Sequence, residues 1–210
     1  MDQTRAALIV IDMQRGFLDA SSPLFIDGAP ETVPACSAAI RHCRENDIPV
    51  FFVTRRYRSD GSDVEHGRFE AWLRGGKPLS PGCPAEISEA MPPEFGEDSR
   101  DYHLYKPRYS AFFQTELDLV LRRLNIDTVI LAGTTTPNCI RTTCYDAMSL
   151  DYNVAILSDC TSSVTEEIQK SNLRDMANIG AQILCSKDWI SGRVPVRNHV
   201  REVRRMRKEL

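Results

Sequence analysis

Short apolar runs recur along the chain and alternate with segments in which apolar residues repeat every three to four positions. The first run covers residues 6–11, and similar runs occupy residues 49–53, 128–132, 154–157 and 181–185. Continuous β-branched and aliphatic runs are typical of parallel strands that are covered on both faces. A shorter strand is expected at residues 102–105, directly before Lys106.

The segments between these runs have the spacing of amphipathic helices. Helices are expected within residues 33–43, 117–124, 138–150 and 165–179. Strands that alternate with helices along a whole chain predict an α/β fold, in which helices cover both faces of a mostly parallel, doubly wound sheet.

Residues 55–101 interrupt this pattern with six glycines and five prolines. We expect loops there, with short helices around residues 69–73 and 85–90. An irregular stretch of this length is often a lid or a binding segment, and a surface insertion without a role is the alternative. The predicted organisation is one domain over residues 1–190, with 55–101 as an insertion or lid, and a basic C-terminal tail over residues 191–210.

Composition and charge narrow the function classes. The chain has 210 residues, 42% hydrophobic and 26% charged, with a formal net charge of −3. This balance gives no general nucleic-acid signal, and no apolar run approaches the roughly 18 residues that cross a bilayer. The tail carries seven Arg or Lys against two Glu, which predicts a solvated or partner-docking helix, with anion or nucleic-acid binding as the alternative.

The seven cysteines include no Cys-x-x-Cys pair, so we expect reduced thiols in a cytoplasmic protein. Cys139 is the candidate nucleophile. A strand is expected to end at Gly133, Thr136 is a suitable N-cap and Pro137 suits the first helical position, which places Cys139 in the first helical turn. Free N–H groups and a partial positive charge there favour a thiolate and could hold an oxyanion. A structural thiol is the alternative.

Asp12 and Lys106 also stand at expected strand ends. Asp12 follows six apolar residues, and a carboxylate in such a place needs solvent or a partner. Taken singly, each residue has an ordinary explanation, a loop cap for Asp12 and a surface position for Lys106. Taken together, a carboxylate, an ammonium and a thiol at three strand ends form a plausible catalytic set.

Three stretches carry a family resemblance: residues 10–14 with Phe17, residues 106–112 and residues 133–147. At these positions the sequence resembles the isochorismatase-like cysteine hydrolases, which include nicotinamidases and N-carbamoylsarcosine amidases, over roughly residues 5–190. The resemblance implies a three-layer α/β/α sandwich. It also implies that Asp12 is the general base, that Lys106 orients and polarises, and that Cys139 attacks the carbonyl carbon.

The resemblance further implies a cis peptide bond between Thr134 and Thr135, and an oxyanion hole formed by the N–H groups of Thr135 and Cys139. Gln14, Phe17 and Tyr109 are expected to line the substrate pocket. Independently of the family, three arginines follow the second strand, Arg55, Arg56 and Arg58. One of them could pair with a substrate carboxylate, which suggests a small ureido or carbamoyl acid, and structural salt bridges are the alternative.

Nicotinamidases carry an Asp and His metal cluster after the second strand, and residues 54–58 of this chain lack it. We therefore expect no metal and no cofactor. The predicted function is hydrolysis of a C–N bond in a small amide, ureido or carbamoyl compound through a thioester on Cys139, in a homo-oligomer (dimer or tetramer). A non-catalytic oligomeric binding relative is the alternative. Nucleotide-binding loops and the Gly-x-Ser-x-Gly elbow of serine hydrolases are absent from the sequence.

Overall fold

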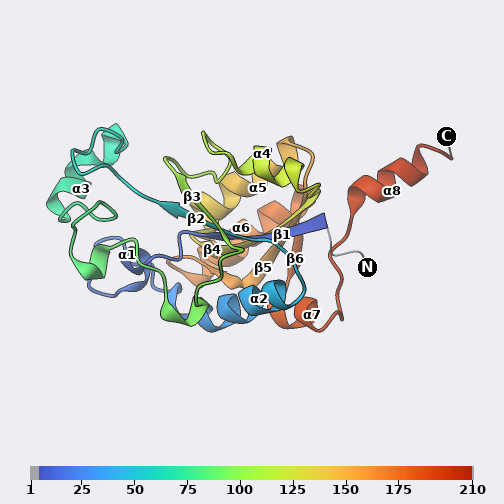
Figure 1. Ribbon diagram of the computed structural model, residues 1–210, viewed down its shortest axis with the longest axis horizontal. Coiled ribbons are helices and arrows are strands. Elements are labelled where there is room, and N and C mark those ends of the chain that lie inside the picture. Colours follow the sequence, from blue (N-terminus) through green and yellow to red (C-terminus); the bar gives the residue numbers. More distant parts are fainter. Residues whose placement is uncertain (1–4, 210) are drawn as a thin grey trace.

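Six strands form one sheet through the middle of the computed structural model, which describes residues 5–209 (Figure 1). The strands are β1 (Ala6–Ile11), β2 (Val50–Arg55), β3 (Tyr102–Lys106), β4 (Thr128–Thr134), β5 (Asn153–Ser162) and β6 (Gln182–Leu184). Their order is β3-β2-β1-β4-β5-β6, and every neighbouring pair is parallel. The predicted parallel, doubly wound sheet is therefore confirmed.

Helices cover both faces of the sheet, as expected for three layers. One layer contains α4 (Leu117–Arg123), α5 (Arg141–Ser149) and α6 (Glu166–Asn178), and the other contains α2 (Val33–Glu45) and α7 (Ser186–Ile190). Alternate residues of β1 enter the two cores, since Ile9 packs with the first layer and Leu8 with the second. Both side chains are fully buried, which explains why β1 is apolar at every position.

The connections leave β1 and β4 in opposite directions. From β1 the chain moves outward to β2 and β3, and from β4 it moves outward to β5 and β6. The carboxyl ends of these two central strands meet where Ile11 pairs with Gly133. Ligand sites in open parallel sheets lie at this kind of reversal point. The residues that follow β1 and β4 are therefore the first candidates for a ligand site.

Residues 55–101 form an irregular segment at one end of the molecule, around α3 (Phe69–Arg74) (Figure 1). It also contains the 3-10 turns η3 (His66–Arg68), η4 (Ala85–Ile87) and η5 (Pro93–Phe95). The expected helix at 69–73 is confirmed, whereas the one expected at 85–90 is a shorter turn because Ser88 is extended, with φ −79° and ψ 170°. A small apolar core that includes Trp72 and Leu79 holds the segment together.

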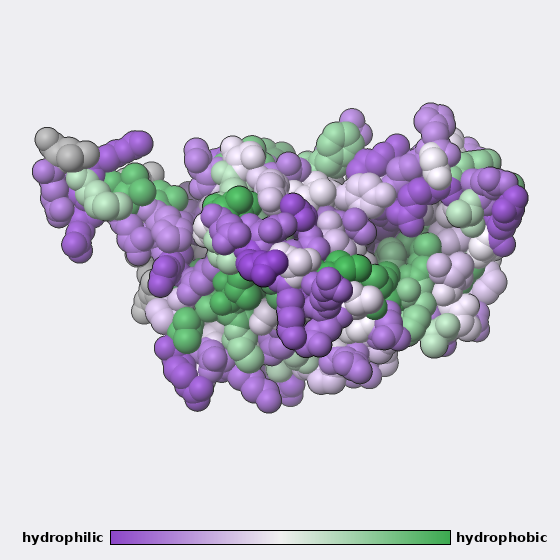
Figure 2. Space-filling view, turned by 180° about the vertical axis from the view of Figure 1, so that it is seen from behind, coloured by the Kyte–Doolittle hydropathy of each residue, from purple (hydrophilic) through white to green (hydrophobic). Residues whose placement is uncertain are grey.

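The remaining helical pieces lie near the two ends of the chain. Two short pieces precede α2, namely α1 (Arg15–Leu18) and η2 (Pro30–Thr32), and α8 (His199–Met206) follows α7. The last helix projects from the body (Figure 1) and carries apolar as well as charged residues (Figure 2). Within residues 5–209, no helix combines the length and the apolar character needed to cross a membrane.

Candidate active site

Three predicted side chains meet at the carboxyl edge of the sheet. Lys106 Nζ lies 2.7 Å from Asp12 Oδ2 and donates a hydrogen bond of 3.5 Å to Cys139 Sγ. Lys106 is the last residue of β3, so its side chain extends across the end of β2 to reach the residue after β1. Their exposed fractions are 0% for Asp12, 1% for Lys106 and 7% for Cys139. The buried charges are therefore paired, as burial of ionised groups requires.

Backbone contacts fix the carboxylate and the ammonium. The N–H of Asp12 donates to the carbonyl of Val53 (3.1 Å), and Asp12 has a φ of 52°, which turns the chain at the strand end. Lys106 Nζ also donates to the carbonyl of Arg108 (3.0 Å). An aspartate tolerates this left-handed conformation better than most residues do, so the local sequence suits the turn.

Cys139 lies in a π-helical turn, η6 (Thr136–Ile140), that leads directly into α5. The expected N-cap is wrong by one residue, because the cap position is Thr135 and Thr136 is the first helical residue. Thr136 Oγ1 instead donates to the carbonyl of Ser162 (3.0 Å) and so fixes η6 to the end of β5. The peptide bond between Thr134 and Thr135 is cis.

The charge state of the thiol differs from the sequence expectation. Burial raises the pKa of Cys139 to about 11, and the nearby carboxylate of Asp12 raises it too, against the opposite effects of Lys106 and Arg55. The position at the start of a helix does not by itself produce a thiolate. At neutral pH the sulfur therefore carries its proton, and any nucleophilic role requires a base within reach.

A cavity of about 230 Å³ opens onto the sulfur of Cys139. Of the predicted residues, the cavity wall includes Phe17, Arg55, Tyr109, Thr135 and Cys139. Residues that the sequence analysis missed are Pro23, Leu24, Phe25, Ile26, Arg68, Thr134 and Asn138. Most of these belong to irregular segments without apolar periodicity, so no pattern identified them.

Arg55 is a buried cation in the cavity wall, 2% exposed. Its Nη1 donates to the hydroxyl of Tyr57 (2.8 Å) and to Glu65 Oε1 (2.5 Å), and its guanidinium carbon lies 5.0 Å from the centre of the Tyr109 ring. Burial opposes the charge, but Asp12, Tyr57 and Cys139 together raise the pKa of Arg55 above its usual value. Its Nη2 is buried without a hydrogen-bond partner among the described residues.

Thr135 offers a second unpaired polar atom, since its Oγ1 is buried without a partner within residues 5–209. Thr134 differs, because its hydroxyl shares a hydrogen bond of 3.0 Å with that of Ser162. Both threonines line the cavity. Of the two threonines, Thr135 is therefore the one that offers a free hydroxyl group in the cavity wall.

Arg56 and Arg58 do not line the cavity, so of the three arginines after β2 the structure brings only Arg55 to its wall. Side chains alternate along an extended chain, and Arg56 points away from Arg55. Its guanidinium makes two hydrogen bonds of 2.5 Å to Glu89 and stacks on the Tyr105 ring at 3.8 Å. Arg58 is exposed, and its Nε lies 3.8 Å from Asp60 Oδ1.

Gln14 is also absent from the cavity wall. Its side-chain amide forms a reciprocal pair with the backbone of Arg55, accepting from the N–H (2.9 Å) and donating to the carbonyl (2.8 Å). Both polar ends are therefore used within the protein. Gln14 thereby joins the loop after β1 to the end of β2 and helps to position Arg55.

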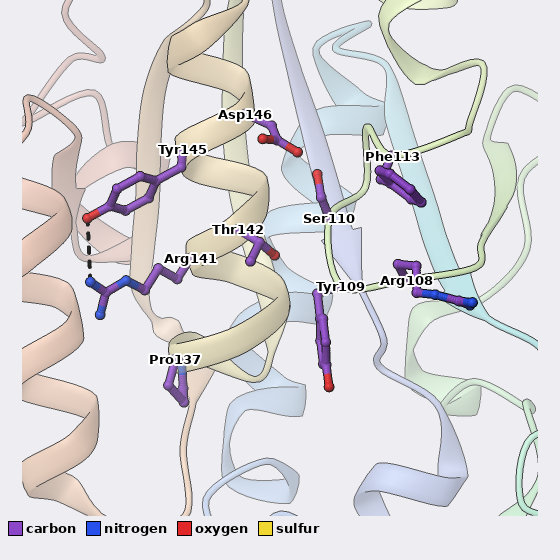
Figure 3. Close-up of a pocket in the computed structure, with 9 residues that line it drawn as sticks. All are labelled: Arg108, Tyr109, Ser110, Phe113, Pro137, Arg141, Thr142, Tyr145 and Asp146. Atoms are coloured by element: carbon purple, nitrogen blue, oxygen red, sulfur yellow. Dashed lines mark hydrogen bonds between the residues drawn. The ribbon is translucent and has the colours of Figure 1, made fainter. Parts of the chain in front are cut away.

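An open surface pocket of about 690 Å³ adjoins the cavity (Figure 3). It lies between the loop after β3, which contributes Tyr109 and Phe113, and the first turns of η6 and α5, which contribute Pro137 and Tyr145. Tyr109 borders both hollows. The larger pocket contains none of the three reactive side chains, so the chemistry of the site belongs to the smaller cavity.

A metal site would need a cluster of ligating side chains. Within the described part of the chain, no group of three or more His, Cys, Asp or Glu residues could hold a metal ion. The metal-free site stays a prediction.

Comparisons with known proteins identify a matching family model, related sequences and related structures. The Isochorismatase domain model matches residues 6–188. The chain is 34% identical to a protein named probable inactive nicotinamidase from Arabidopsis thaliana, over 87% of this chain and 93% of that protein. It is 28% identical to maleamate amidohydrolase of Pseudomonas putida, over 88% and 84% of the two chains.

A crystal structure of an isochorismatase family protein from Desulfovibrio vulgaris matches with a TM-score of 0.82 at 36% identity. The match covers 88% of this chain and 95% of that one. The resemblance read from the three sequence stretches is thus confirmed, and this chain belongs to the isochorismatase family.

Proposed function

We propose that this protein is a cysteine hydrolase that cleaves a C–N bond of a small amide, ureido or carbamoyl compound. The observation that carries the proposal is the contact of Lys106 with both Asp12 and Cys139 beside a small cavity that Cys139 lines. A thiol, a carboxylate and an ammonium in contact supply a nucleophile, a proton acceptor and a fixed positive charge. The relationship to maleamate amidohydrolase supports the same class of reaction.

The first half of the reaction begins with the protonated thiol. Asp12 accepts the proton of Cys139 as the sulfur attacks the carbonyl carbon, and the new S–C bond yields a tetrahedral oxyanion. Lys106 stabilises the negative charge that develops nearby. The raised pKa of Cys139 fits this order of events, because proton removal and attack then occur together within the complex.

Departure of the nitrogen completes the acylation. Asp12 returns the proton to the leaving nitrogen, the C–N bond breaks, and an amine or ammonia departs, which leaves a thioester on Cys139. Asp12 then takes a proton from a water molecule whose oxygen attacks the thioester carbonyl. Collapse of this second intermediate releases the acid, and the thiolate recovers its proton from Asp12.

The N–H groups of Thr135 and Cys139 are the proposed oxyanion donors. Both residues line the cavity, and both lie at the start of the η6–α5 helix, where backbone N–H groups lack helical acceptors. The free hydroxyl of Thr135 is an additional donor beside the same position. Removing one such donor in other hydrolases costs about 10²- to 10³-fold in kcat.

A screen of small amides and ureides for ammonia release tests the proposal. The wild-type chain should release ammonia from at least one compound, and Cys139→Ala should lower this rate by about 10⁴-fold or more, since the nucleophile is gone. Cys144→Ala is the matched control. Cys144 is a buried core thiol on α5, the helix that follows η6, and burial alone raises its pKa. Equal rates in the wild type and Cys139→Ala would refute the mechanism.

The rival function is a non-catalytic binding protein that retains the same three side chains. The name of the Arabidopsis relative, probable inactive nicotinamidase, is the specific observation in its favour. Absence of turnover across the screen, together with tight binding of one of the same compounds to the wild-type chain, would favour this rival.

A further inference from the structure

The cavity has an imbalance of charge that the proposed chemistry does not use. Asp12 is paired with Lys106, and Glu65 is paired with Arg55 at 2.5 Å. Arg68, the last residue of η3, also lines the cavity and is half-buried. Among the residues that the structure describes, its side chain has no ion pair and no hydrogen bond, and none of the cavity-lining residues is acidic.

Arg55 adds a second unsatisfied donor to the same wall. Its side chain is 2% exposed, yet Nη2 has no partner, while Nη1 is engaged by Tyr57 and Glu65. Leaving a buried donor unpaired is costly, and a charged one more so. A ligand oxygen would relieve that cost, so this atom is an independent sign that the wall is completed by a bound acceptor.

The size of the cavity limits the ligand. One water molecule occupies about 30 Å³ in the liquid, so a cavity of about 230 Å³ has room for about eight non-hydrogen atoms. The rest of its wall combines apolar side chains such as Phe17 and Leu24 with polar ones such as Asn138. The cavity suits a short carbon chain with a polar group at each end. Cys139 is one of the residues that line it.

We propose that the substrate carries one negative charge, a carboxylate that binds Arg68, at the opposite end of a short chain from the bond that Cys139 cleaves. The inference rests on the proposed function for the identity of the scissile end, but the charge recognition is a binding property in its own right. Arg55 Nη2 donates to a polar oxygen of the same ligand. The irregular segment 55–101 then has a role, because it brings a charge-selecting residue to the cavity.

Succinamate and succinamide are the test pair, because they differ by a carboxylate in place of an amide. In the wild-type chain, succinamate should bind more tightly than succinamide. Arg68→Met should raise KM for succinamate by about 10- to 100-fold, the range of a lost charge-assisted hydrogen bond, with little change in kcat. KM for succinamide should stay within about twofold, and Arg68→Lys should recover part of the preference.

The control is Arg74→Met, which removes an exposed arginine of the same segment that pairs with Glu70 on α3. It should leave both KM values unchanged. Equal weakening of succinamate and succinamide by Arg68→Met would show a general packing effect and would overturn the inference.

A calorimetric titration separates this inference from the proposed function. In a Cys139→Ala background, succinamate should still bind, and adding Arg68→Met should weaken it by the same 10- to 100-fold. If succinamate does not bind, or if succinamate and succinamide bind equally tightly, the charge inference is overturned, whatever the turnover results are. Turnover that persists in Cys139→Ala overturns the hydrolase mechanism but leaves the binding result standing.

Discussion

Cys139 is surrounded by charges of both signs, and their balance decides how readily its thiol ionises. Burial and Asp12 raise its pKa to about 11, while Lys106 and Arg55 oppose them. At pH 7 only about one thiol in 10⁴ would then be ionised. The carboxylate of Asp12 has two opposite effects: it suppresses the free thiolate, and in the proposed mechanism it accepts the thiol proton when a substrate is present.

This balance predicts how alkylation of Cys139 depends on pH. The rate with iodoacetamide should be low at pH 7 and rise about tenfold per pH unit towards pH 11, because only the thiolate reacts. Replacing Asp12 by Asn removes a neighbour that raises the pKa, so alkylation at pH 7 should accelerate even though hydrolysis is lost.

Mass spectrometry of labelled peptides gives the rate at each cysteine. Cys83 lies outside the site and is partly exposed, so it is the internal reference. Its alkylation rate at a given pH should be the same in the wild-type and Asp12→Asn chains. If the Asp12→Asn chain keeps its circular dichroism spectrum and Cys139 still labels at the wild-type rate, the electrostatic account is wrong.

At the scale of elements, the close pairing of β1 with β4 brings Asp12 and Cys139 to the same edge. Gly133 has a φ of 113°, and a Cβ at this position would lie 2.0 Å from the carbonyl oxygen of Ile11. Only glycine fits a backbone that approaches its neighbour so closely. The end of β4, which leads into η6, therefore requires glycine at position 133, because a larger residue would collide with β1.

Gly133→Ala should lower the free energy of unfolding by about 3 kcal/mol or more, since both the contact and the dihedral are unfavourable. Urea denaturation measures this value. Gly67→Ala is the matched control, because a Cβ there meets nothing within 4 Å, and its effect should stay within about 0.5 kcal/mol. Similar stabilities of the two variants would contradict the close approach.

The elements were largely predictable from the sequence, because strand and helix periodicities reflect local burial. β1 matches its apolar run at Ala6–Ile11. β5 is longer than expected, Asn153–Ser162. Polar residues such as Ser162 continue the strand, because the Ser162 hydroxyl shares a hydrogen bond with that of Thr134 and its carbonyl accepts one from Thr136. Such pairings depend on a neighbouring strand and leave no local pattern.

Two kinds of sequence information located residues of the site: strand ends located the three charged or thiol side chains, and the family resemblance located Phe17 and Tyr109. Asp12, Lys106 and Cys139 could be located because parallel strand ends share one edge of a sheet. Two features needed the three-dimensional structure: the opposite directions of Arg55 and Arg56, and the approach of Arg68 from a turn that lacks periodicity. The raised pKa of the thiol likewise results from burial that the sequence did not reveal.

At the scale of the whole molecule, the C-terminal helix α8 lies apart from the main body. α8 projects from the body (Figure 1), and its residues Val203 and Met206 are 40% and 54% exposed. Few apolar groups are buried by folding this helix onto its own chain. The expected homo-oligomer stays a prediction, and this helix is a natural place to test it.

Removal of residues 199–210 should leave the melting temperature within about 2 °C, because little apolar area is lost from the core. Differential scanning calorimetry measures the change, and light scattering on both chains measures their mass. A fall of 10 °C or more at unchanged mass would show that α8 supports the body of its own chain.

The placement of the reactive side chains on the sheet has a consequence for how such proteins diversify. Asp12 and Lys106 are anchored at strand ends, whereas Phe17 and Arg68 reach the cavity from short helical turns in the connections between strands. Loops accept replacement more readily than the strands that they connect. A descendant of this scaffold can therefore acquire a new ligand preference by exchanging loops alone, while the side chains at the strand ends stay unaltered.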